Sequence, residues 1–152
     1  MKNNRRDFLK TFVATSIALP LISKANISEK PERKLGIALV GLGNYATNNL
    51  APAFVNTQFC RLAGIVTGTP AKAEIWKKKY DIPEKNVYNY QNFDEIAKNP
   101  DIDVVYVVLP NGMHHEFVLR AAKAGKHVIC EKPMAISVKE SEEMIAACKA
   151  AK

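Results

Sequence analysis

Apolar residues in this chain gather in short runs that are separated by longer mixed stretches. The runs are rich in β-branched residues, and most of them show no alternation of apolar and polar positions. Strands covered by helices on both faces have this pattern, whereas a strand with one wet face alternates. The predicted strands are Leu35–Val40, Leu62–Val66, Val104–Leu109 and His127–Cys130, with a weaker one at Asn86–Tyr88.

The stretches between these runs carry the end signals of helices. Thr69 before Pro70 predicts a hydroxyl cap followed by a proline in the first helical turn. Residues 92–95 and 137–140 have the spacing of a capping box, and Gly125 predicts a left-handed helix end. Because strands and helices alternate, we expect the α/β class, with a doubly wound parallel sheet.

The composition is that of one globular domain with a basic leader. Of the 152 residues, 47% are hydrophobic, and the formal net charge is +7. Residues 1–25 carry five basic side chains against one acid, so more than half of the excess charge lies there. No basic stripe is left to predict a nucleic-acid partner. No apolar run reaches the roughly 18–20 residues of a membrane span, so the only membrane contact we expect is with an export machinery.

The leader has the features of a targeting segment. Residues 4–10, N-R-R-D-F-L-K, resemble the twin-arginine export signal. An apolar stretch and a small-x-small site at residues 23–25 follow, which predicts cleavage after Ala25. We therefore expect a signal peptide over residues 1–25, a linker over residues 26–34 and a periplasmic protein. The alternative is a basic N-terminus without a targeting role.

The three cysteines are Cys60, Cys130 and Cys148. Their number is odd, and they have neither C-x-x-C spacing nor the spacing of a zinc site. Cys60 and Cys130 lie in predicted strands and Cys148 lies in the last predicted helix. We expect free thiols, buried in the two strands, and no bound metal.

A glycine motif follows the first predicted strand. Residues 41–46, G-L-G-N-Y-A, fit the pattern G-x-G-x-x-[G/A] and open a helix. The first glycine permits a tight turn, the second lets a diphosphate approach the backbone, and Ala46 allows close packing of helix on strand. The free N–H groups at the helix start would bind the phosphates. The motif predicts a Rossmann dinucleotide-binding fold, and the alternative is a simple turn.

The tip of the second strand bears on the choice of cofactor. NAD-selective sites place Asp or Glu there, to bind the ribose 2′-hydroxyl. This chain has no acidic residue between Gly41 and Ala73, and instead has Thr67, Gly68 and Lys72. A hydroxyl, a glycine and an ammonium suit a 2′-phosphate, so we expect NADP, with NAD possible. The alternative is a solvated Lys72.

Two further turns complete a family pattern. With Leu109-Pro110-Asn111 and Glu131-Lys132-Pro133 in place, the region from residue 35 to 152 resembles the Gfo/Idh/MocA oxidoreductases, and within them the glucose–fructose oxidoreductase branch. The resemblance implies that residues 109–111 contact the ribose and nicotinamide, and that His114 lines that site. It also implies that Tyr90 covers the adenine or phosphate end. Ordinary packing roles for His114 and Tyr90 are the alternatives.

The resemblance gives Lys132 the catalytic role. It implies that this lysine lies beside the nicotinamide and bonds the reacting oxygen of a sugar or polyol. An ammonium there stabilises the developing alkoxide or relays its proton, and Glu131 orients it. The residues expected to contact the cofactor are Gly41, Leu42, Gly43, Asn44, Tyr45, Ala46, Thr67, Gly68, Lys72, Tyr90, Leu109, Pro110, Asn111, His114, Glu131 and Lys132.

The resemblance also implies residues beyond this sequence. Its members run to about twice this length, with a second β-sheet domain, and are expected to be homo-oligomers. We therefore expect a dinucleotide-binding domain over residues 35–152 that lacks its last strand, which leaves residues 127–130 as a sheet edge open to association. Three functions stay open: a sugar oxidoreductase of the glucose–fructose type, a redox glycosidase that uses NAD, and a nucleotide-binding fragment without catalysis.

Overall fold

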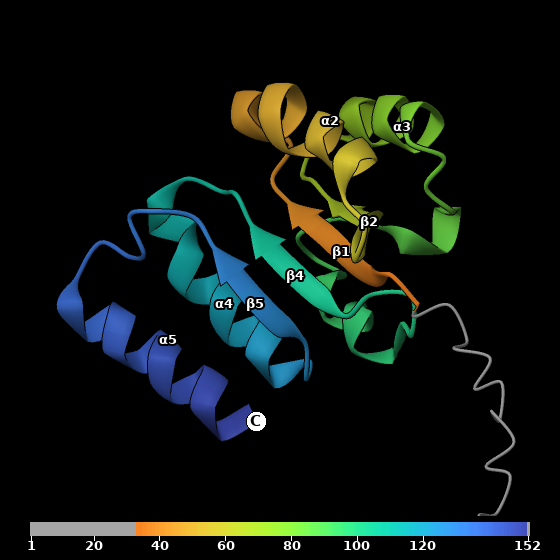
Figure 1. The fold of residues 1–152 in the computed structure, drawn as a ribbon. Coiled ribbons are helices and arrows are strands. Elements are labelled where there is room, and N and C mark those ends of the chain that lie inside the picture. Colours follow the sequence, from red (N-terminus) through yellow and green to blue (C-terminus); the bar gives the residue numbers. More distant parts are fainter. Residues whose placement is uncertain (1–32, 152) are drawn as a thin grey trace, which may run out of the picture. The chain divides into compact units, whose positions relative to one another are not determined.

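The computed structural model describes residues 33–151 (Figure 1). The strands are β1 (Leu35–Val40), β2 (Cys60–Val66), β3 (Val87–Tyr88), β4 (Val104–Val107) and β5 (His127–Cys130). The α-helices are α2 (Ala51–Ala53), α3 (Pro70–Lys79), α4 (His114–Lys123) and α5 (Val138–Ala151). Shorter helical turns are η1 (Ala46–Leu50), η2 (Phe54–Asn56), η3 (Glu84–Asn86), η4 (Phe93–Lys98) and η5 (Asn111–Met113).

The five strands form one parallel sheet in the order β3-β2-β1-β4-β5. Helices α2 and α3 cover one face of the sheet, and α4 and α5 lie on the other (Figure 1). This confirms the predicted α/β class and the doubly wound parallel sheet. Strand β5 is an edge of the sheet among the described residues, as expected.

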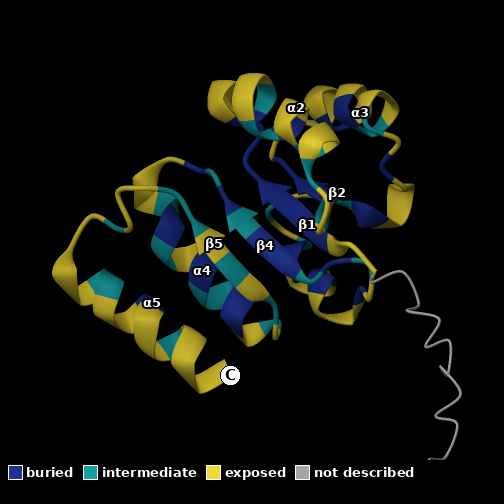
Figure 2. Ribbon diagram, in the orientation of Figure 1, coloured by how far each residue is buried: buried dark blue, intermediate teal, exposed yellow. Residues whose placement is uncertain are grey.

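The central strand β1 is buried on both faces, which explains why its sequence does not alternate (Figure 2). Leu39 packs with Ile65 and Trp76 under α2 and α3. On the opposite face, Val40 belongs to the cluster that contains Phe117 of α4 and Met144 of α5. Two apolar layers therefore hold the sheet, one on each face.

The segment after β1 is helical but irregular. It passes from the π turn η1 through α2 to the 3₁₀ turn η2. Pro52 lies in this segment and has no N–H, so it cannot donate the bond that a regular helix needs at that position. The sequence motif predicted a helix start here, and the proline explains why the helix is not uniform.

The helix-end predictions have mixed outcomes. Gly125 has a φ of +68° after α4, as expected of a left-handed helix end, and the Ser137 hydroxyl accepts a bond from the Glu140 N–H at 3.2 Å. Thr69 precedes α3, but its hydroxyl makes no capping hydrogen bond. The Thr69 N–H donates to the Thr67 hydroxyl. The prediction of a capping box at residues 92–95 is wrong. The Asn92 amide oxygen accepts a bond from the Asn89 N–H instead, and a 3₁₀ turn follows.

The last two residues of the expected linker contact the domain. Arg33 forms an ion pair with Asp103, and the Lys34 ammonium donates to the Thr57 carbonyl at 2.9 Å. The predicted leader lies outside the described residues. Among residues 33–151, no helix has the length and apolar character required to cross a membrane.

Candidate functional site

All predicted site segments meet at one edge of the sheet. The strands are parallel, so the segments that follow β1, β2, β4 and β5 leave at their shared carboxyl end (Figure 1). Ligands of open α/β sheets bind at this edge. It brings together the glycine loop, Thr67, the turn at residues 109–111 and the turn at residues 131–133.

The two glycines of the loop have different roles. Gly41 allows the backbone conformation, and Gly43 leaves the surface of the loop open. Gly41 has a φ of +98°, and a Cβ there would lie 2.8 Å from the Val108 carbonyl oxygen and 2.9 Å from the Leu109 side chain. A Cβ on Gly43 would meet nothing within 4 Å, so this face of the loop is open. Ala46 is fully buried. The structure thus gives these three positions the geometry that the motif predicted.

The start of the following helix can receive an anion. The Thr47 N–H donates to the Gly43 carbonyl at 2.9 Å and begins the helical bonding. The amides before it belong to the first turn of a helix, where N–H groups have no partner within the helix. Asn44 and Tyr45 are exposed beside them. These features fit a diphosphate on the backbone of the loop.

Lys72 reaches from α3 to the glycine loop. Its ammonium donates to the Leu42 carbonyl at 3.2 Å, which places a positive charge between the tip of β2 and the loop. Thr67 is 5% exposed, and its hydroxyl accepts a bond from the Thr69 N–H. Lys72 is therefore a cation beside both the glycine loop and the tip of β2.

Tyr90 lies on Gly68. A Cβ on Gly68 would be 2.8 Å from the Tyr90 ring, so the ring packs directly on the glycine backbone. A pocket of about 460 Å³ opens beside this contact. Its lining residues include Thr67, Gly68, Pro70, Ala73, Tyr88 and Tyr90.

His114 joins two of the predicted turns. Its Nε2 atom lies 2.7 Å from the Leu109 carbonyl oxygen, and its Nδ1 atom lies 3.0 Å from that of Pro133 and 3.3 Å from that of Met134. Both ring nitrogens therefore lie within hydrogen-bond distance of carbonyl oxygens, one in each turn. The ring is 1% exposed. His114 therefore connects the turns from inside and does not present a nitrogen to the open edge.

The Glu131-Lys132-Pro133 turn is held by a tyrosine. The Tyr106 hydroxyl donates to Glu131 at 2.5 Å, and the other carboxylate oxygen accepts from the Lys132 N–H at 3.3 Å. Burial, and then the bond to Glu131, raise the pKa of Tyr106 above its ordinary value. Lys132 itself is exposed, and its peptide bond to Pro133 is cis. The described residues leave Lys132 exposed, so only a contact with another group, such as a bound ligand, would bury this lysine.

Sequence reasoning missed Tyr106. Its partner is 25 positions away, so no local motif pairs them. The available signal was the aromatic residue within an otherwise aliphatic strand that leads to a site turn.

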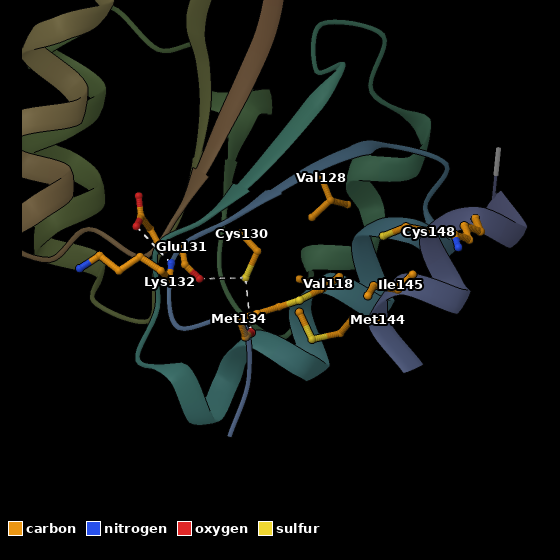
Figure 3. A pocket seen from close by; sticks show the side chains of 10 residues that line it. Val118, Val128, Cys130, Glu131, Lys132, Met134, Met144, Ile145 and Cys148 are labelled. Atoms are coloured by element: carbon orange, nitrogen blue, oxygen red, sulfur yellow. Dashed lines mark hydrogen bonds between the residues drawn. The ribbon is translucent and has the colours of Figure 1, made fainter. Parts of the chain in front are cut away.

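A second pocket, of about 470 Å³, lies beside β5 and between α4 and α5 (Figure 3). Cys130, Met134, Met144 and Cys148 bring sulfur atoms to its lining, while the Lys132 side chain points away from them. The three thiols are free, as expected, but Cys60 and Cys130 are only half-buried and Cys148 is exposed. Burial, and then the charges of Glu131 and Cys148, raise the pKa of Cys130 to about 11.

A parallel sheet with a glycine loop at its carboxyl edge defines a dinucleotide-binding protein of the Rossmann type. The family described as "Oxidoreductase family, NAD-binding Rossmann fold", Gfo/Idh/MocA, matches residues 35–152. The chain belongs to this family.

Solved and curated relatives agree with this assignment. An aldose–aldose oxidoreductase from Caulobacter crescentus, crystallised with glycerol, is 54% identical with a TM-score of 0.77, over 78% of this chain and 36% of that one. A dTDP-3,4-didehydro-2,6-dideoxy-alpha-D-glucose 3-reductase from Saccharopolyspora spinosa is 32% identical over 76% of this chain and 32% of its own length. A D-xylose 1-dehydrogenase [NADP(+)] from Haloarcula marismortui is 30% identical over 73% and 31%. The chain spans about a third of the length of these curated relatives.

Proposed function

We propose that this chain is the NADP-binding domain of an exported sugar oxidoreductase similar to the glucose–fructose enzymes. One observation carries the proposal: the glycine loop and the Glu131-Lys132-Pro133 turn lie at the same sheet edge and are connected through Leu109 and His114. The relatives named above include an aldose oxidoreductase and an NADP-dependent xylose dehydrogenase, which supports sugars as the substrate class.

Different residues at this edge of the sheet bind different parts of the cofactor. The amides after Gly41 bind the diphosphate, and Lys72 binds the 2′-phosphate. Residues 109–111 lie toward the ribose and nicotinamide. When bound, the nicotinamide supplies the hydride acceptor. Lys132 extends its ammonium from the turn and stabilises the oxygen that gains negative charge as an alcohol carbon becomes a carbonyl. Glu131 keeps the turn in place through Tyr106.

The choice of cofactor can be tested on the chain itself. Lys72→Glu should weaken NADP binding by about tenfold or more, because a repulsive carboxylate replaces an attractive ammonium near a dianion. Binding of NAD should change little. Lys78→Glu, an exposed position on the same helix, makes the same change in net charge and is the matched control. Equal losses of NADP affinity in the two variants, measured by calorimetry, would remove the argument for a 2′-phosphate site.

Hydride transfer needs a substrate domain, and the Caulobacter relative can provide one. We would replace the matching part of that enzyme with residues 35–152 and follow nicotinamide absorbance after adding an aldose. Lys132→Ala should abolish turnover and leave the cofactor bound, while Lys139→Ala on the exposed side of α5 should not change turnover. Retained turnover in Lys132→Ala would refute the catalytic role. Cleavage of a glycoside without net reduction would favour the redox glycosidase, and cofactor binding without turnover would favour a non-catalytic nucleotide-binding domain.

Export and assembly complete the proposal. The twin-arginine pattern of residues 4–10 supports delivery to the periplasm, and membership of the Gfo/Idh/MocA family supports a homo-oligomer. A reporter fused after residue 34 should be exported, and replacement of Arg5 and Arg6 by lysine should retain it in the cytoplasm. Export that survives this replacement would exclude the twin-arginine route.

A further inference from the structure

The loop that carries Tyr90 is braced mainly by its own side chains. The Asn89 amide oxygen accepts from the N–H groups of Gln91 and Asn92 at 2.8 and 2.9 Å, and the Asn92 amide oxygen accepts from the Asn89 N–H at 2.8 Å. These bonds set the shape of the loop, but they do not fix it to the domain.

Arg120 of α4 supplies a fixed point. Its Nη1 atom donates to the Tyr90 carbonyl at 2.9 Å across 30 residues of sequence. The guanidinium lies 5.0 Å from the ring centres of both Phe93 and Phe117. Its Nε atom donates to Asp94 at 2.9 Å, and the side chain is 20% exposed. Apolar packing and ion pairing thus hold Arg120 in one orientation.

Arg120 fixes the backbone from which the Tyr90 ring extends. The ring meets the edge of Phe117 at a centroid distance of 5.3 Å and lies against Gly68, where even a Cβ would overlap it. It forms one wall of the pocket of about 460 Å³ at the tip of β2. A shift of the loop would therefore change the shape of that pocket directly.

We infer that Arg120 is a positioning residue for the adenosine half of the cofactor, because it fixes Tyr90 against Gly68. The inference rests on the proposed function. Arg120 is too enclosed by Phe93, Phe117 and Asp94 to be a direct phosphate ligand, so its effect passes through Tyr90.

The test measures the binding of two probe molecules to the full chain of 152 residues. Binding of 2′,5′-ADP and of inorganic pyrophosphate is followed by amide NMR at Gly68 and Gly43. Arg120→Met keeps an apolar stem and removes the donors, so it should weaken 2′,5′-ADP by about tenfold and leave pyrophosphate unchanged. Asp94→Asn removes one ion-pair partner of Arg120 but leaves the pair with Glu116 at 3.1 Å and the bond to Tyr90, and should leave both affinities unchanged.

A second variant guards against loss of folding in Arg120→Met. Gly68→Ala forces the Tyr90 ring away without altering Arg120, and should produce the same selective loss. Unchanged 2′,5′-ADP affinity in Arg120→Met and Gly68→Ala, or equal weakening of both probes in them, would overturn the positioning role and leave the proposed function intact. If the unsubstituted chain binds neither probe, the proposed function itself is refuted, and the inference with it.

Discussion

Replacing His114 tests whether the two site turns are held together from inside. His114→Leu fills much of the same space but removes both ring nitrogens that contact the turns. The Leu109 carbonyl is left in a buried position, where loss of a partner costs about 1–3 kcal/mol. The Pro133 carbonyl is partly accessible to water, so loss of its contact with His114 adds about 1 kcal/mol or less to the destabilisation. We expect a total destabilisation of about 1–4 kcal/mol, a substantial part of the 5–15 kcal/mol typical of a domain.

The assay is urea unfolding followed by the fluorescence of Trp76, the only tryptophan, which is 4% exposed. The neighbouring histidine provides a matched control. His115 is paired with Glu143 at the surface, so His115→Leu should cost less than about 1 kcal/mol. Hydrogen exchange at residues 131–134 should accelerate in His114→Leu and not in the control. Equal unfolding midpoints for the two variants would refute the structural connection through His114.

Three further predictions address pH, the glycine loop and thiol reactivity. Burial raises the pKa of Asp103, but the Gly36 N–H and Arg33 stabilise the carboxylate, so the pKa of Asp103 is lowered overall. This stabilisation of the fold is complete above the ordinary carboxyl pKa of about 3.9 and is lost as the pH falls through the lowered pKa. Asp103→Asn should therefore unfold more easily than the unsubstituted protein at pH 7, and the difference should vanish in strong acid. Gly41→Ala should destabilise the fold by about 1 kcal/mol or more, whereas Gly43→Ala should keep stability and lose nucleotide binding, as seen by calorimetry. With its pKa raised to about 11, Cys130 should react with iodoacetamide at a rate that still increases above about pH 10, a trend that mass spectrometry can follow and that an early plateau would contradict.

The fold could be predicted from the sequence because its signals are local. The run at residues 35–40 is a buried parallel strand over those same bounds, and the run at 127–130 is the predicted edge. The glycine loop was predictable for the same reason, since strand, turn and helix start are contiguous. Sequence reasoning failed in two helices: Pro52 made one predicted helix irregular, and the Thr69 hydroxyl does not cap the other.

The supports of the site could not be predicted, because they join residues that are distant in sequence. Tyr106 and Glu131 are 25 residues apart, and Arg120 and Tyr90 are 30 apart. Nothing in either neighbourhood indicates the partner. The resemblance pointed to His114, but the burial that makes it a connector depends on two turns folding over it.

Helix α4 connects both ends of the proposed cofactor site. His114 begins it and contacts the turns at the nicotinamide end, and Arg120 lies six residues later, about 9 Å along the axis, and holds the Tyr90 loop at the adenosine end. Between them, fully buried Phe117 packs against both Phe93 and Tyr90. A rigid helix that fixes both contacts keeps the two ends at a constant separation, which a cofactor of fixed length requires. Loosening the centre of α4 should therefore impair binding at both ends together, whereas loss of either contact alone should impair only its own end.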